Sequence, residues 1–168
     1  MIYFIWLLRI IHIVAGVFWV GGTLIMTFFV APSIGATAEA GQRFVGHLMN
    51  NLKFSNRMSA AAGATILAGF ILYWIDSQGF TSAWMSSGAG RGFGIGGAFA
   101  LIGLVLGIML GRINKAMAQL GSQTQGKPSS NQLTQIQELS RRQTTFSRVT
   151  AGSLVLATIF MAIARYLG

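Results

Sequence analysis

The first apolar run of the chain carries two ionisable side chains at helical spacing. At 100° per residue, one face of a helix over residues 2–31 collects Arg9, His12, Gly16, Trp19 and Met26. An ionisable group in hydrocarbon is costly unless it has a partner or reaches water, so such groups face the interior of a membrane bundle. His12 is therefore the first candidate for a functional residue.

A histidine in this position can hold a metal or a haem, or can simply bond to a neighbouring helix. Neutral imidazole is a good ligand for haem iron and for copper. Gly16 would let a flat macrocycle or a neighbouring backbone lie close, and Arg9 could pair with a haem propionate. The chain has no cysteine, so a haem would be of b type. In the alternative interpretation, His12 hydrogen-bonds a carbonyl or hydroxyl on a facing helix and no cofactor is present.

Other residues define what such a site could contain. Thioether sulfur is a soft ligand for copper(I), and Met26 is a candidate because it shares the face of His12. His47 lies in a charged connection roughly 30 Å or more away along the helix rise, so both histidines cannot ligate one haem. A second axial ligand, if there is one, would then come from a group other than histidine, such as a methionine, a lysine or a carbonyl. The chain's three scattered carboxylates predict no acid–base pair.

Composition places these residues in a membrane protein. Of the 168 residues, 53% are hydrophobic and 9% are charged, which is typical of an integral membrane protein. The pattern predicts an all-α, four-helix membrane bundle in a single domain over residues 1–168, surrounded by lipid. The net charge of +9 follows from basic connections between spans, and no nucleic-acid partner is expected.

Apolar runs and breakers predict the spans at residues 2–31, 58–75, 93–111 and 149–167. Pro32 is expected to end the first span, and the amphipathic stretch 33–57 to extend the second. The third and fourth helices should project from the membrane as a hairpin over residues 112–148. A linker with cap residues at positions 129–131 should start the fourth helix.

Small residues predict where helices pack closely in lipid. Gly103, Gly107 and Gly111 recur at every fourth position, and Ser59 and Gly63 repeat that spacing. Such patterns favour close backbone contact, either within one bundle or between two copies of the chain.

The basic residues also predict orientation. Residues 33–57 and 112–148 together hold nine Lys or Arg, whereas the other side has three, at Arg9, Arg91 and Arg165. By the positive-inside rule both termini should face outward, which in the inner (cytoplasmic) membrane of a bacterium means the periplasm.

The string HIVAGVFWVGGTLIMTFFVAP, with a small-residue second span and a terminal FMAIARYLG, resembles the CopD-like family of bacterial membrane proteins. It is similar, more distantly, to the HemJ-type protoporphyrinogen oxidases. The match rests on His12, Trp19, Gly21, Gly22 and Pro32. The resemblance implies a four-helix core with a b-type haem at His12, and a role in copper handling or porphyrin oxidation. The basic residue that the HemJ pattern places late in the first span has no counterpart between residues 13 and 42.

These observations give one leading hypothesis and two alternatives. The leading one is a small membrane redox protein that binds b-type haem through His12, with Arg9 near a propionate and Gly16 and Trp19 lining the pocket. It would work with a redox partner. The alternatives are a copper-binding or copper-transport module of CopD type, with His12 and Met26 as ligands, and a cofactor-free structural subunit of a larger membrane complex.

Overall fold

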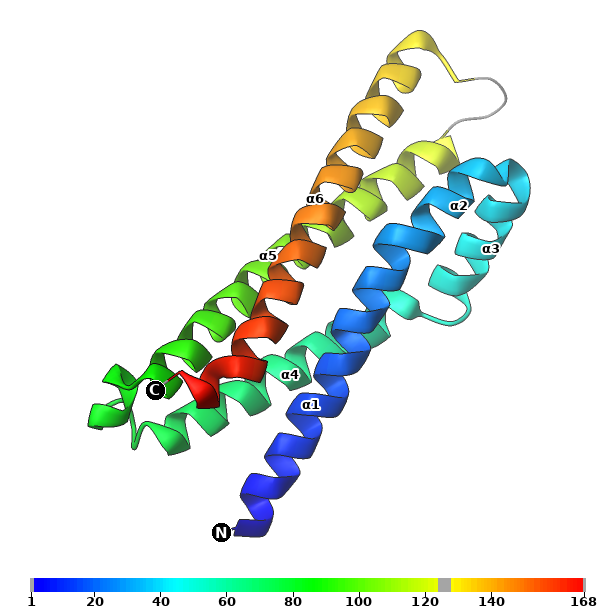
Figure 1. Cartoon of the computed structure of the whole chain (residues 1–168). Helices are drawn as coiled ribbons and strands as arrows, with labels where there is room; N and C mark the ends of the chain where they lie inside the picture. Colours follow the sequence, from blue (N-terminus) through cyan, green and yellow to red (C-terminus); the bar gives the residue numbers. More distant parts are fainter. Residues whose placement is uncertain (1, 124–127, 168) are drawn as a thin grey trace.

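The computed structural model describes residues 2–123 and 128–167, and within these ranges the chain forms helices and turns but no strand. Figure 1 shows the elements in order. The α-helices are α1 (Ile2–Ile25), α2 (Ala31–Ala36), α3 (Ala38–Asn50), α4 (Phe54–Asp76), α5 (Gly88–Gln123) and α6 (Ser130–Ile163). A π-helical turn, η1 (Met26–Val30), joins α1 to α2, and 3-10 turns lie at η2 (Ala83–Ser86) and η3 (Ala164–Tyr166). The all-α bundle predicted from the sequence is confirmed.

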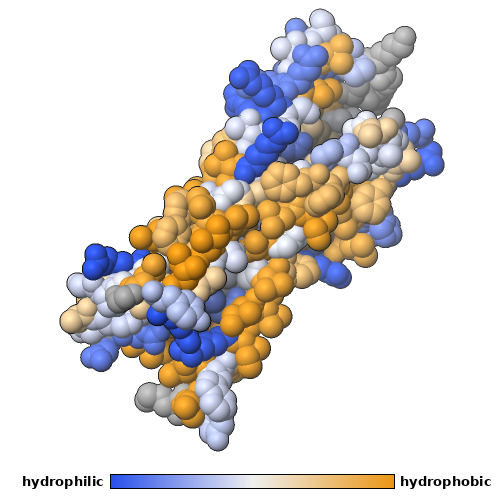
Figure 2. All heavy atoms as spheres, in the orientation of Figure 1, coloured by the Kyte–Doolittle hydropathy of each residue, from blue (hydrophilic) through white to orange (hydrophobic). Residues whose placement is uncertain are grey.

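Four helical segments are long and apolar enough to cross a bilayer. They are Ile2–Ala36, Phe54–Asp76, Gly88–Gln123 and Ser130–Tyr166. Figure 2 shows apolar side chains over the middle of the visible face and hydrophilic residues gathered toward the two ends. Exposed apolar surface of this extent requires lipid around it, so the chain is a multi-pass membrane protein.

Pro32 does not end the first helix, contrary to the sequence-based expectation. The helix passes through it and continues to Ala36. In the π turn that precedes it, the Ala31 N–H donates to the carbonyl of Met26. A wider turn relieves the clash between a proline ring and the carbonyl four residues earlier, so the helix need not stop. The Ser33 hydroxyl donates to the Phe29 carbonyl at 2.7 Å and supports the same turn.

The stretch 33–57 is not an extension of the second span, as the sequence had indicated, but contains a separate helix. Figure 1 shows α3 turning back beside α2 before the chain enters α4. Lys53 adopts a left-handed backbone conformation with φ of 48°, which breaks the helical path between α3 and α4. The second span therefore starts at Phe54, earlier than predicted, and it ends at Asp76.

The third and fourth helices form a long hairpin, as predicted. α5 begins at Gly88, five residues before the expected start, and runs to Gln123. The linker residues 124–127 lie outside the described residues. The Ser129 side chain accepts from the Gln132 N–H, and the Gln132 side chain accepts from the Ser129 N–H, which confirms a cap in the predicted region. Beyond the apolar part of the hairpin, Gln143 Nε2 donates to Asn114 Oδ1 at 2.7 Å.

The bundle consists of two helix pairs. α5 packs along α6 and α1 packs along α4, whereas the α4–α5 and α1–α6 contacts that join the pairs are much less extensive. Trp19, Ala62 and Leu154 form a buried cluster from α1, α4 and α6. This cluster is the point at which side chains from both pairs share one core.

The predicted glycine seam is only partly present. A Cβ at Gly103 would lie 2.7 Å from Leu154 Cδ2, whereas Cβ atoms at Gly107, Gly111 or Gly63 would meet nothing within 4 Å. The α5–α6 contact instead runs toward the start of α5, where a Cβ at Gly96 would lie 3.3 Å from the carbonyl oxygen of Ala157. Close packing therefore follows the residues that face α6 and not the every-fourth-residue pattern alone.

We expect Gly103→Ala to destabilise the bundle by about 1–3 kcal/mol, since the added methyl displaces Leu154, which is 1% exposed. Gly107→Ala is the matched control on the same helix and should leave stability equal or slightly higher. Denaturation of both variants in one detergent measures the difference. Equal losses for the two variants would contradict the assigned α5–α6 contact.

Candidate functional site

His12 lies on the face of α1 that packs against α4. Its Nδ1 lies 2.8 Å from the main-chain carbonyl oxygen of Thr65. A carbonyl oxygen can only accept, so Nδ1 carries the proton in this bond. In neutral imidazole the lone pair then resides on Nε2, and the ring is fixed in the form that can coordinate through Nε2.

Small residues on α1 and α4 make room for this arrangement. A Cβ at Gly69 would lie 2.7 Å from His12 Cε1 and 2.9 Å from Nδ1, so only glycine fits under the ring. A Cβ at Gly16 would lie 3.5 Å from Thr65 Cγ2, at ordinary contact distance. Gly16 thus faces Thr65 across the contact between α1 and α4, and an added methyl would fit there. The Thr65 hydroxyl is occupied by a bond to the Ala61 carbonyl at 2.8 Å.

The second ring nitrogen of His12 is open. Nε2 makes no hydrogen bond to any residue that the structure describes. It is also not enclosed: among the described residues, the buried polar side-chain atom without a partner is Ser82 Oγ. His12 as a whole is half-buried. The ring therefore has one nitrogen held by the backbone and the other available to an external group.

Arg9 and Trp19 flank His12 on the same helix but have different surroundings. Arg9 is half-buried, lies about one turn from His12 toward the N-terminus, and forms no ion pair with a described residue. Trp19 is 5% exposed and belongs to the cluster with Ala62 and Leu154. Trp19 therefore packs in the core that joins the two helix pairs.

Met26 and His47 do not approach His12. Met26 begins the π turn fourteen residues further along the same helical rod, which corresponds to about 21 Å. The structure therefore does not bring His12 and Met26 together as ligands of one ion. His47 is exposed on α3, beyond the start of α4. Within residues 2–123 and 128–167, no group of three or more His, Asp or Glu side chains is placed to hold a metal ion.

The two clearest hollows of the surface lie away from His12. One, of about 280 Å³, lies between α2 and α3 and is lined by residues that include Ile34, Gly41 and Phe44. The other, of similar volume, is an apolar groove on α5 at Leu101, Ile102, Val105 and Leu106. Neither hollow is lined by a charged side chain. His12 and its neighbours are therefore the better candidate for a binding site.

Thr65 and Gly69 were not predicted as site residues. The second span has a run of small residues from Ala60 to Ala64, a hydroxyl at Thr65, and a small pair at Ala68 and Gly69. That run indicates a close helix contact, but the sequence does not say which of its carbonyls faces a histidine fifty-three residues away. Four-residue spacing between Thr65 and Gly69 puts both on one face of α4, and this is the signal that could have located them.

The fold and the site define an all-α, multi-pass membrane protein with one histidine held between its first two spans. Comparison with protein-family models, with curated proteins and with solved structures finds no match.

Proposed function

We propose that the protein is a small membrane redox protein that binds b-type haem through Nε2 of His12. The observation that supports this most is the pairing of a backbone-held Nδ1 with an open Nε2. Histidines that ligate metals almost always donate their other ring N–H to a carbonyl, carboxylate or water, which fixes the ring and raises its basicity. The resemblance of the first span to CopD-like and HemJ-type proteins supports the same proposal.

The residues around His12 fit such a group chemically. His12 would supply a nitrogen ligand, the Thr65 carbonyl would orient the ring, and Gly69 leaves room for the ring. Arg9 has no carboxylate partner among the described residues and offers a guanidinium to an anionic substituent. When bound, the haem would supply one-electron chemistry, and the protein contributes ligation, orientation and local charge.

We propose that both termini face the outside of a bacterial inner membrane. His12 and Arg9 are then nearer the outer surface, because α1 begins at that end. An electron carrier needs an exchange partner, and in this arrangement that redox partner would approach from the outer side. The basic connections at the opposite end support this orientation.

A second candidate function is structural and is favoured by the same hydrogen bond. His12 links α1 to α4, and such a link stabilises a bundle without any cofactor, as in a subunit of a larger membrane complex. A copper module of CopD type has less support, because His12 and Met26 do not converge.

An absorbance spectrum separates these candidates. We expect the protein, purified in mild detergent from cells supplied with a haem precursor, to show a Soret band with one haem per chain. Absence of the band, even after incubation with haem, would remove the proposal. Elemental analysis of the same sample for copper and iron distinguishes the copper module from the cofactor-free subunit.

A further inference from the structure

The register between α1 and α4 leaves part of the first helix outside the membrane-spanning region. A Cβ at Gly22 would lie 2.8 Å from Met58 Sδ and 3.8 Å from Phe54 Cζ, so α4 begins at the level of Gly22. α4 has 23 residues, or about 34 Å, which matches the hydrocarbon thickness. The fourteen residues after Gly22 therefore continue about 21 Å past the start of α4.

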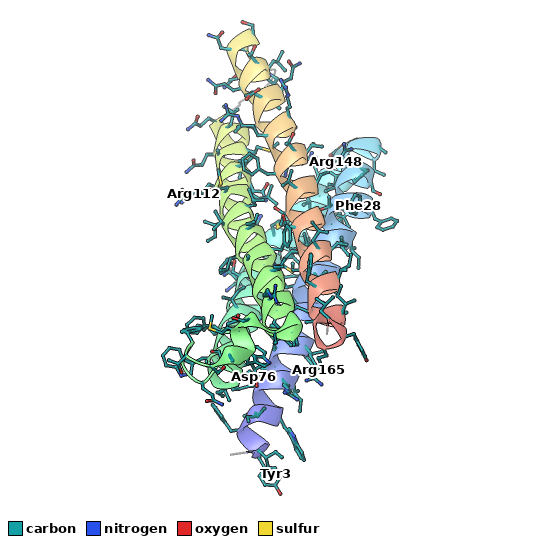
Figure 3. All side chains as sticks on the ribbon, turned by 60° about the vertical axis from the view of Figure 1, so that its left-hand side comes forward. Tyr3, Phe28, Asp76, Arg112, Arg148 and Arg165 are labelled. Atoms are coloured by element: carbon teal, nitrogen blue, oxygen red, sulfur yellow. The ribbon has the colours of Figure 1, made fainter. Side chains whose placement is uncertain are left out.

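This projecting segment and α3 form a hairpin, which we call the α2–α3 hairpin and define as residues 26–53. Its two arms meet next to the turn that joins them, where a Cβ at Gly41 would lie 2.7 Å from Ile34 Cα. Figure 3 shows Phe28 toward the same end of the molecule as Arg112 and Arg148, and Tyr3 at the opposite end.

Large apolar side chains of the hairpin are uncovered. Phe29 is 69% exposed, Phe44 is 55% exposed and Phe28 is 53% exposed, and Leu52 is exposed to a lesser degree, at 43%. Outside a bilayer such groups would face water, whereas aromatic rings at the level of the lipid headgroups are stabilised. The hairpin thus has an apolar surface that needs an occupant.

The charges around this surface favour an anionic occupant. Arg43, Lys53 and Arg57 are all exposed at the hairpin and at the start of α4. The single acidic residue among them, Glu39, is bound to Arg43 at 2.5 Å, so Lys53 and Arg57 have no acidic partner among the described residues. The bilayer is also the nearest surface, because the spans α1 and α4 tether the hairpin to the bilayer at both ends. This tethering raises the effective concentration of the hairpin at the bilayer surface.

We propose that the α2–α3 hairpin docks on the leaflet at its own end of the bundle and binds anionic phospholipid headgroups. Lys53 and Arg57 would contact the phosphate groups, and Phe28, Phe29 and Phe44 would insert among the headgroups. Amphipathic helices with a basic edge bind anionic membranes in this way. The proposal is independent of what His12 binds.

The chain has no cysteine, so a single fluorescent label can report the position of α3. Gly46 is suitable, because a Cβ there would meet nothing within 4 Å. The full-length Gly46→Cys protein, labelled with an environment-sensitive fluorophore, is placed in bilayers of phosphatidylcholine alone or with phosphatidylglycerol. Quenching by a spin label on the lipid headgroup measures how close α3 lies to the leaflet.

We expect stronger quenching in the phosphatidylglycerol bilayer and its loss at high salt. Lys53→Gln with Arg57→Gln should reduce docking roughly 30-fold. The matched control is Lys115→Gln with Arg141→Gln, which removes the same charge from the α5–α6 hairpin and should leave quenching unchanged. Phe44→Ser should also weaken docking.

Three results would overturn the proposal. Quenching that is the same in both bilayers and in all variants would mean that α3 is free in water or held by protein. Strong quenching that depends on Phe44 but not on lipid charge would leave an apolar contact without headgroup recognition. A fall in quenching on adding an acidic protein, with no response to lipid charge, would identify a protein as the occupant instead.

Discussion

Replacing His12 by asparagine should abolish haem binding while leaving the bundle folded. The asparagine amide nitrogen takes nearly the place of Nδ1, so it can still donate to the Thr65 carbonyl. What it lacks is Nε2. Loss of a residue that only hydrogen-bonds to a metal ligand lowers metal affinity about 10–100-fold. Loss of the ligand itself should lower haem affinity by at least that factor. Haem titration followed at the Soret band measures the change.

His12→Ala is the companion variant because it removes both nitrogens. It should lose haem and also stability, by about 1 kcal/mol for the missing hydrogen bond and more for the cavity left by the ring. If asparagine and histidine proteins bind haem equally well, Nε2 is not the ligand. If the asparagine variant also matches the wild type in stability, His12 serves only to hold α1 against α4.

Gly69→Ala should destabilise the protein through the same histidine. The new methyl would lie 2.7 Å from His12 Cε1, which forces the ring away from Thr65. We expect a loss of about 1–3 kcal/mol in the free energy of unfolding, together with weaker haem binding. Gly63→Ala on the same helix is the matched control, because a Cβ there meets nothing within 4 Å. Titration with a denaturing detergent measures the stability of both variants, and haem titration at the Soret band measures their haem binding.

A double variant identifies the cause. When His12 is already alanine, the space over Gly69 is free, so adding Gly69→Ala should cost little. The coupling between the two positions should therefore be large, as expected for residues in contact. If Gly69→Ala costs the same with and without the imidazole, its effect arises elsewhere in the helix.

Much of the fold follows from the sequence because hydrocarbon imposes strong rules. Apolar length sets the number of spans, and Ser129 was within the group expected to cap α6. The turns were harder. Pro32 is a helix breaker in water-soluble proteins, but a single π turn absorbs it here. The break between α3 and α4 depends on one left-handed residue, Lys53, and lysine carries no signal for that conformation.

The candidate site was only half accessible from the sequence. His12 and Arg9 are conspicuous because charge is rare in a span. Their partners are not, because the Thr65 carbonyl is a backbone group that every residue possesses, and Gly69 is one glycine of twenty-two. Trp19 was expected to line a pocket but lies in the core with Leu154. Which face of α4 meets α1 depends on tertiary packing.

Resonance Raman spectroscopy of the reduced, haem-loaded protein tests the central proposal most directly. The chain has two histidines, so His47→Gln leaves His12 as the single imidazole. With nitrogen-15 histidine in this variant, we predict that the iron–imidazole stretching band shifts to lower frequency. A bound haem whose low-frequency spectrum is insensitive to histidine labelling would contradict ligation by His12.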